Sequence, residues 1–300
     1  MKRFYSNGKI LLCGEYVITK GAKAIGLPTK MGQDLCVINN SNNIIKWTSL
    51  NSDKKIWFEC ILNIKKLDII ETTDEAITLK LIQILKICKE INPNFLISGK
   101  TVRTNLTFDF NWGLGTSSTL INNISQWANV NPYFILNKSF GGSGYDIACA
   151  QNNSSILFSK HKTNNKIVPV NFSPSFKEYL FFIYQNKKQN TQLEIKEFNN
   201  KSKISSNIID DISNLSIEFL KCANLKDFSK LIDYHENLIG SLLNKKPLKS
   251  KFPDYKGTVK NLGAWGGDFF LAAGPKDSLD YFINKNLKTG FKYQEIIKEF

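Results

Sequence analysis

Residues 102–128 read VRTNLTFDFNWGLGTSSTLINNISQWA, and in them a strand, a glycine-bearing loop and a helix are predicted one after another. Apolar runs bounded by turn-forming residues predict strands at 95–101 and 102–108. Apolar residues that recur three and four positions apart predict a helix through 120–128. This order places the loop at the N-terminal end of a helix.

The loop has two features that suit a phosphate group. Gly113 and Gly115 permit tight backbone turns, and hydroxyls follow at 116–118, where free N–H groups and the helix dipole attract anions. The loop has neither the Gly-Lys-Ser/Thr of a Walker A motif nor the third glycine of a dinucleotide fingerprint. It therefore predicts either a phosphate cradle or an ordinary capped helix without a ligand.

The rest of the chain predicts an α+β protein in two lobes. In the first half, strands are predicted at 10–13, 35–38, 44–48 and 56–61, and an amphipathic helix at 74–91. In the second half, strands are predicted at 155–159, 167–170 and 179–184, helices at about 206–222 and 226–243, two strands around 263–268 and a helix near 275–284. We expect an N-terminal domain at 1–165 and a C-terminal domain at 166–300.

The composition excludes several classes of protein. Three hundred residues, 42% hydrophobic and 12% aromatic, are enough for real cores in one or two domains. The apolar runs are far shorter than the roughly 18 residues that cross a bilayer, and the N-terminal segment lacks a secretory core, so we expect a cytoplasmic protein without a membrane partner. Six scattered cysteines and two histidines disfavour disulfides, zinc and Ser-His-Asp catalysis.

The net charge of +14 comes almost entirely from lysine. Arg3 and Arg103 are the only arginines among 40 basic residues, in a chain also rich in Asn and Ile, as an A+T-rich genome would produce. Proteins that read nucleic acid rely on the arginine fork, and here the lysines are spread along the whole chain. We therefore expect solvated surface lysines or a site for an anionic small molecule, and no nucleic acid partner.

Two further glycine clusters could carry chemistry. Asp146 follows the cluster GGSG at 141–144 and is either a carboxylate stabilised by a helix dipole or, if Lys9 lies beside it, a group that orients an acceptor hydroxyl. The segment GAWGGD at 263–268 predicts a plain hairpin or a backbone contact to phosphate. Glu15 is either an edge-strand carboxylate or a site residue, and Lys256 and Lys260 are either solvated or face an anionic substrate.

In their order and separation, three segments resemble the motifs of the GHMP kinases, the superfamily of galactokinase, homoserine kinase, mevalonate kinase and phosphomevalonate kinase. The segments are GKILLCGEY at 8–16, GLGTSS at 113–118 and GAWGGD at 263–268. The tripeptide at 14–16 and the segment GSGYDIA at 142–148 are most similar to phosphomevalonate kinases. The resemblance covers essentially the whole chain and implies an N-terminal lobe like domain 2 of ribosomal protein S5 and a ferredoxin-like C-terminal lobe.

The resemblance also implies a reaction and its residues. ATP, with Mg²⁺, would phosphorylate an anionic small molecule, 5-phosphomevalonate in isoprenoid precursor synthesis, in an enzyme that is a monomer or homodimer. Asp146 would be the catalytic carboxylate, Lys9 its partner and Ser117 the metal ligand. The residues implied to bind ATP are Gly113, Leu114, Gly115, Thr116, Ser117 and Ser118. Those implied to bind the substrate are Glu15, Ser143, Gly144, Lys260, Gly263, Ala264, Gly266 and Gly267.

Three positions depart from the family pattern. Asn111-Trp112 replaces the proline that normally precedes the loop, Trp265 replaces the middle glycine of the third motif, and Ile135 stands where mevalonate kinases have a metal-binding Glu. Metal binding would then rest on Ser117 and the nucleotide. The alternative functions are a mevalonate kinase, a diphosphomevalonate decarboxylase and, as Trp265 and Ile135 suggest, a catalytically inactive nucleotide-binding regulator.

Overall fold

A computed structural model of the chain describes residues 1–161, 164–187, 198 and 204–299. The chain divides into two compact units. Unit 1 comprises Met1–Gly8, Met31–Phe110 and Leu114–Gln151, and unit 2 comprises Lys9–Lys30, Asn111–Gly113 and Asn152–Phe300.

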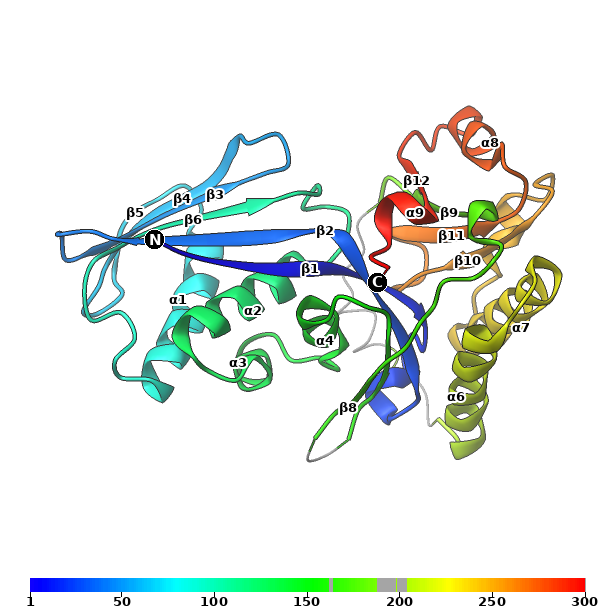
Figure 1. The fold of residues 1–300 in the computed structure, drawn as a ribbon, viewed down its shortest axis with the longest axis horizontal. Helices are drawn as coiled ribbons and strands as arrows, with labels where there is room; N and C mark the ends of the chain where they lie inside the picture. Colours follow the sequence, from blue (N-terminus) through cyan, green and yellow to red (C-terminus); the bar gives the residue numbers. More distant parts are fainter. Residues whose placement is uncertain (162–163, 188–197, 199–203, 300) are drawn as a thin grey trace. The chain divides into compact units, whose positions relative to one another are not determined.

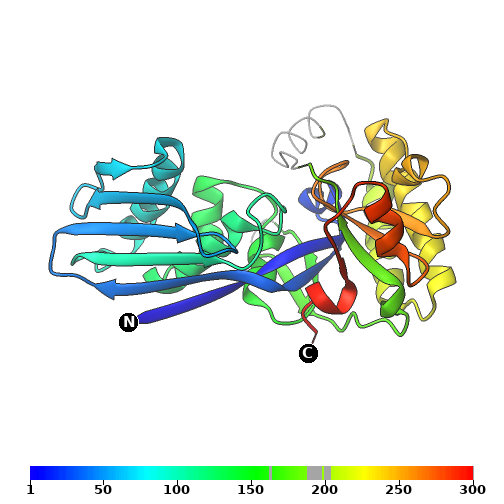
Figure 2. The same cartoon turned by 90° about the horizontal axis from the view of Figure 1, so that it is seen from above.

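Unit 1 is a sheet with helices on one face (Figure 1). Its strands follow the order β5-β4-β3-β6-β2, with β1 beside β2, and Figure 2 shows them side by side. Only the β3–β6 pair is parallel among the pairs whose register is described in this unit. The strands are β1 (Lys2–Cys13), β2 (Ala24–Asn39), β3 (Ile44–Leu50), β4 (Ile56–Asn63), β5 (Ile69–Thr72) and β6 (Lys100–Leu106).

The helices of unit 1 share one apolar core with the sheet. They are α1 (Glu75–Ile91), α2 (Thr116–Ala128), α3 (Pro132–Ser139) and α4 (Tyr145–Gln151). Along β2, Leu35 and Val37 are buried in this core, whereas Asp34, Cys36 and Ile38 are on the other face of the sheet. One face of the sheet is thus covered by helices and the other carries polar and charged side chains.

Unit 2 contains an antiparallel sheet of order β10-β11-β9-β12. Its strands are β9 (Leu180–Tyr184), β10 (Thr258–Asn261), β11 (Phe269–Ala273) and β12 (Gly290–Lys292). Its helices are α6 (Ser206–Lys221), α7 (Leu225–Leu243), α8 (Ser278–Asn284) and α9 (Tyr293–Ile296), with α6 packed against α7. The first residues of β2 pair with β7 (Ile156–Ser159), which pairs with β8 (Lys166–Pro169). Short 3-10 turns occupy Val17–Lys20, Lys177–Tyr179 and Leu248–Lys251.

The α+β class is confirmed, and most predicted elements are present. The strand predicted at 95–101 is wrong: Phe95 and Leu96 are buried in a turn, with Leu96 in a left-handed conformation (φ 57°), and β6 begins only at Lys100. These apolar residues fill the core of unit 1 from a loop, so their apolar run resembles a strand. The elements β5, α3, β12 and α9 were not predicted, because they are only three to eight residues long and carry weak periodicity.

The two units are not separated by a single cut in the sequence. The expected domains, 1–165 and 166–300, stay a prediction, and the two units exchange the chain at residues 8/9, 30/31, 110/111, 113/114 and 151/152. The first two exchanges fall inside β1 and β2, because each of these long strands contributes its two halves to different units. In the described part of the chain, no helix is long and apolar enough to span a membrane.

Candidate active site

The loop between β6 and α2 leads into a helix that starts without a side-chain cap. Gly113 (φ 68°) and Gly115 (φ 96°) are both left-handed, and Gly115 is the N-cap of α2. A glycine has no side chain with which to cap, and the structure shows no side-chain capping hydrogen bond at this helix start. The first-turn N–H groups of a helix of 13 residues are therefore unsatisfied by a cap. Of the two interpretations of the loop, this geometry favours the phosphate cradle.

The three hydroxyls of the loop differ in their surroundings. Ser118 donates a hydrogen bond to the Gly115 carbonyl at 2.9 Å and is buried. Thr116 is half-buried and Ser117 is exposed, and across the described residues neither hydroxyl has a hydrogen bond. Of the three hydroxyls, that of Ser117 is therefore the most accessible to a ligand bound at the start of α2.

Asp146 lies in the first turn of α4, in the same unit as residues 114–118. Helix α4 packs against α2, the helix that follows the loop. Ser143 is buried and accepts a hydrogen bond from the backbone N–H of Tyr145 at 3.4 Å, while Gly142 and Gly144 both have positive φ. The glycines thus supply the sharp turn into α4, and Asp146 is half-buried at its start.

Lys9 belongs to unit 2, where it is half-buried in β1. Its pairing with Asp146 stays a prediction.

A buried ionic cluster occupies the core of unit 2. The Lys260 ammonium lies 2.5 Å from Glu15 Oε1, and His235 Nε2 lies 3.0 Å from Glu15 Oε2. All three side chains are at most 3% exposed. Burial alone would raise the pKa of Glu15, but the charge of Lys260 and then the contact with His235 outweigh it and lower that pKa below its ordinary value. Burial, and then the charge of Lys260, lower the pKa of His235, so its neutral form is favoured.

Glu236, next to His235 on α7, joins this cluster to the third motif. Its carboxylate accepts hydrogen bonds from Asn261 N at 2.9 Å, from Asn261 Nδ2 at 3.0 Å and from Leu248 N at 3.0 Å. Asn261 Oδ1 in turn accepts from Gly266 N at 3.1 Å. Burial raises the pKa of Glu236. The cluster therefore fixes the backbone at residue 266.

The first motif contacts the third directly. The Tyr16 hydroxyl accepts a hydrogen bond from the backbone N–H of Trp265 at 2.8 Å. The loop 263–268 is thus anchored at two successive N–H groups, by Tyr16 and by Asn261. Gly263 (φ 70°) remains open, because a Cβ built on it would meet no atom within 4 Å.

The departures at 112 and 265 have structural explanations within unit 2. The Trp265 side chain is buried, and its ring lies 3.6 Å from the position that a Cβ on Gly240 of α7 would take, so the indole packs beside α7 at ordinary contact distance. Trp112 packs edge-on against Phe269 and Phe291, with ring centroids 5.9 and 5.2 Å away. Aromatic packing therefore fixes the approach to the loop where the family pattern has proline.

Gly113 also contacts the end of the third motif. A Cβ built on it would lie 2.2 Å from Asp268 Oδ2, so the Asp268 carboxyl occupies the space beside this glycine. A larger residue at 113 would have to displace the Asp268 carboxyl and adopt a left-handed φ, so both the contact and the backbone favour glycine.

Ile135 is fully buried on α3 in the core of unit 1. In the part of the chain that the structure describes, no group of three or more His, Cys, Asp or Glu side chains could hold a metal ion.

Sequence reasoning missed His235, Glu236 and Asn261. A signal for the first two was present, because they interrupt the buried stripe of α7 formed by Phe228, Ile232 and Ile239. A polar pair in such a stripe is expected to be hydrogen-bonded or ion-paired. Asn261 gave no signal, since its role depends on the partner that the fold supplies.

No family model and no curated protein matches this sequence. Among solved structures, the chain is similar to the mevalonate kinase of Methanococcus jannaschii, with a TM-score of 0.72 at 16% identity, covering 100% of this chain and 98% of that one. It is also similar to the Streptococcus pneumoniae phosphomevalonate kinase in complex with phosphomevalonate and AMPPNP, with a TM-score of 0.72 at 14% identity, covering 97% of this chain and 100% of that one. A third similar structure is the Lactococcus lactis galactokinase complexed with galactose, with a TM-score of 0.65 at 12% identity, covering 99% of this chain and 93% of that one.

The fold is therefore one used by small-molecule kinases. More narrowly, the chain has the fold of the GHMP kinases over its whole length, which confirms the fold that the three motifs implied.

Proposed function

We propose that this protein is an ATP-dependent kinase that transfers the γ-phosphoryl group to a small anionic acceptor, 5-phosphomevalonate. The observation that carries the proposal is the uncapped start of α2 at the left-handed Gly115, in unit 1 with Asp146. Support comes from the fold, which this chain shares with a phosphomevalonate kinase solved in complex with phosphomevalonate and AMPPNP.

In the proposed mechanism, the backbone of residues 113–118 and the positive end of α2 hold the phosphates of ATP. Ser117 fits a metal ligand because its hydroxyl is exposed and has no hydrogen bond among the described residues. Mg²⁺ bound there with the nucleotide supplies charge neutralisation and usually keeps several waters. Asp146 and Lys9 orient the attacking oxygen, which in a phosphate acceptor is already ionised near neutral pH.

The proposed acceptor site uses backbone more than side chains. Ser143, Gly144, Gly263, Ala264, Gly266 and Gly267 are its proposed contacts, and the open space at Gly263 supports this assignment. The resemblance implied that Glu15 and Lys260 touch the substrate, and we now propose a different role for them. Their side chains are 3% and 0% exposed and neutralise each other, so we assign them to holding the loop 263–268 in place.

Mevalonate is the alternative acceptor, favoured by the equal TM-score of 0.72 to a mevalonate kinase. We expect ADP release, measured by a coupled assay, with 5-phosphomevalonate, and less with mevalonate, homoserine or galactose. Product analysis separates the reactions, since a diphosphate identifies the proposed kinase, a monophosphate a mevalonate kinase, and CO₂ a decarboxylase. Tight ATP binding without ADP release on any acceptor would contradict the proposal and favour a regulator.

A further inference from the structure

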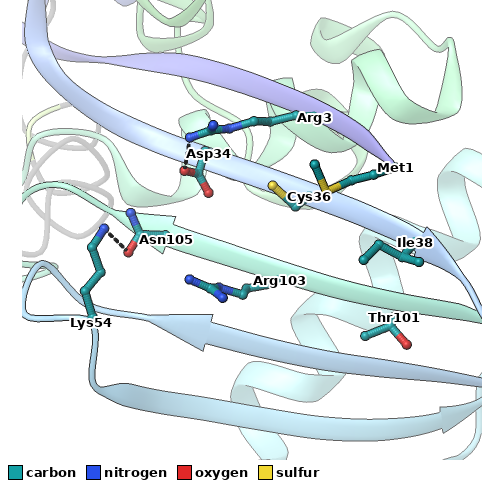
Figure 3. A pocket seen from close by; sticks show the side chains of 9 residues that line it. All are labelled: Met1, Arg3, Asp34, Cys36, Ile38, Lys54, Thr101, Arg103 and Asn105. Carbon is teal, nitrogen blue, oxygen red and sulfur yellow. Dashed lines mark hydrogen bonds and ion pairs between the residues drawn. The ribbon is translucent and has the colours of Figure 1, made fainter.

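Unit 1 contains a hollow on the face of its sheet that the helices leave uncovered. Its volume is about 410 Å³, and it is bounded by β1, β2, β6 and the turn between β3 and β4 (Figure 3). The charged residues that line it are Arg3, Asp34, Lys54 and Arg103. We call this hollow the arginine pocket.

The arginine pocket and helix α2 lie on opposite faces of the sheet. Gln33 of β2 faces α2, because its side chain accepts a hydrogen bond from Thr119 at 2.8 Å and its carbonyl accepts one from Asn123 at 2.9 Å. Asp34, the next residue, lines the pocket. Successive side chains of a strand point to opposite faces, so the sheet itself lies between the pocket and α2.

The side chains of the arginine pocket are partly fixed and leave one cation available. Arg3 pairs with Asp34 at 3.0 Å, and the Lys54 ammonium donates to Asn105 Oδ1 at 2.9 Å. Arg103 is exposed, and within the described residues its guanidinium has neither a hydrogen bond nor an ion pair. Figure 3 shows Arg103 on the same strand as Asn105, with no dashed line to any of the residues drawn. Three cations and one carboxylate therefore surround an open space, with five N–H donors of Arg103 unused.

The choice of residue is as informative as the charge. The chain has 40 basic residues, of which only two are arginines, and both line this pocket. Lysine would supply the same charge, but only the planar guanidinium forms paired, parallel hydrogen bonds to a phosphate or carboxylate group. Where nearly every other basic position is lysine, two arginines in one hollow indicate recognition of an oxyanion by its geometry.

We propose that the arginine pocket binds a small polyanion through its phosphate or carboxylate oxygens, with Arg103 as the principal contact and Arg3 and Lys54 beside it. The site does not depend on the proposed kinase activity. It requires only that the ligand approach the uncovered face of the sheet.

The arginine content provides a direct readout. Selective ¹⁵Nε-arginine labelling gives two Nε–H signals, one from each arginine, and both report on the pocket. The full chain is titrated with inorganic pyrophosphate and, separately, with citrate, at constant ionic strength. We expect both signals to shift with one saturating curve, and the probe that saturates at lower concentration identifies phosphate or carboxylate as the preferred group.

Variants locate the binding. Arg103→Gln removes the charge, and Arg103→Lys keeps the charge but removes the fork. We expect each variant to raise the probe concentration at which the Arg3 signal is half shifted by about tenfold or more. This is the range expected for a lost bidentate contact. Lys86→Gln is the matched control, because Lys86 is an exposed lysine of α1 on the helical side of the sheet, and it should leave the titration unchanged.

The proposal is overturned if neither probe gives a saturable shift, or if Arg103→Gln leaves the Arg3 titration as it was. Both arginine variants are exposed substitutions, and their backbone amide spectra show whether the sheet is intact.

Discussion

Lys260 and Glu15 are 245 positions apart in the sequence, and their charged groups meet at 2.5 Å in the interior of unit 2. Neither side chain has appreciable access to water. Glu15 and Tyr16 belong to the first motif. Lys260 directly precedes Asn261, whose side chain is hydrogen-bonded to the third motif. This ion pair therefore joins the two motifs inside a single unit.

Breaking this pair on one side should be costly. Glu15→Gln leaves the buried Lys260 ammonium without its counter-charge, and we expect a loss of about 3–5 kcal/mol in the free energy of unfolding. Urea denaturation measures it. Lys276→Met is the control, since the pair that Lys276 forms with Glu178 is exposed (63% and 52%) and should cost about 1 kcal/mol or less.

A double variant separates charge burial from packing. Glu15→Gln with Lys260→Met removes both charges, so it should recover part of the stability lost in the single variant. If the double variant is as unstable as the sum of the two singles, the cost arises from packing and the ion pair is not its cause.

Stability should fall as the pH is lowered through the range of a free histidine. The pKa of His235 is lowered in the folded state, so between that pKa and the ordinary value near 6.5 the unfolded chain binds more protons. The stability that follows from this lowered pKa is fully present above about pH 6.5. Below that pH the free energy of unfolding declines, by at most about 1.4 kcal/mol per pH unit for one proton.

Unfolding free energies measured from pH 7.5 to 5.5 test this expectation. His235→Asn should flatten the slope in this range, whereas the wild-type slope should persist in His161→Asn, which changes the other histidine of the chain. Glu236 contributes with the opposite sign because its pKa is raised, and it is present in all three proteins. An unchanged slope in His235→Asn would assign the pH dependence to other groups.

Gly113 should be less tolerant of alanine than another left-handed glycine. Gly113→Ala places a methyl group against the Asp268 carboxyl in addition to straining a φ of 68°, whereas Gly141 (φ 69°) has no atom within 4 Å of such a methyl. We expect roughly 1–2 kcal/mol of destabilisation for Gly141→Ala and more for Gly113→Ala, by denaturation.

The contact itself is tested by a second substitution. Asp268→Ala removes the carboxyl, so Gly113→Ala should cost less in that background, by about 0.5–3 kcal/mol in a double-mutant cycle. Additive effects would show that the backbone conformation alone excludes alanine.

The proposed reaction predicts a specific kinetic defect. Asp146→Asn should lower kcat by about 10²–10⁴ with little change in the KM for ATP, because the carboxylate acts on the acceptor oxygen and does not hold the nucleotide. Steady-state ADP release measures both constants. Asp210→Asn, at an exposed aspartate of α6, should match the wild type. Full turnover by Asp146→Asn would remove this residue from the catalytic role.

The loop and its helix could be predicted because their signals are local. Two glycines, three hydroxyls and the apolar spacing of 120–128 are adjacent in sequence, and together they dictate a left-handed turn at a helix start. The long helices α1, α6 and α7 were predicted for the same reason. The false strand at 95–101 shows the limit, because apolar residues in a buried turn resemble a strand until their neighbours are known.

The sequence alone established the α+β class, the three glycine segments and Asp146 at a helix start, since each depends on residues within a few positions of one another. Tertiary structure decided that Lys260 is enclosed with Glu15, that His235 and Glu236 support the third motif, and that both arginines line one pocket. The register of β10 with β11 and of β2 with β6 sets which side chains meet. A slip of one residue would turn each side chain to the opposite face, so burial and pairing are properties of the assembled sheet.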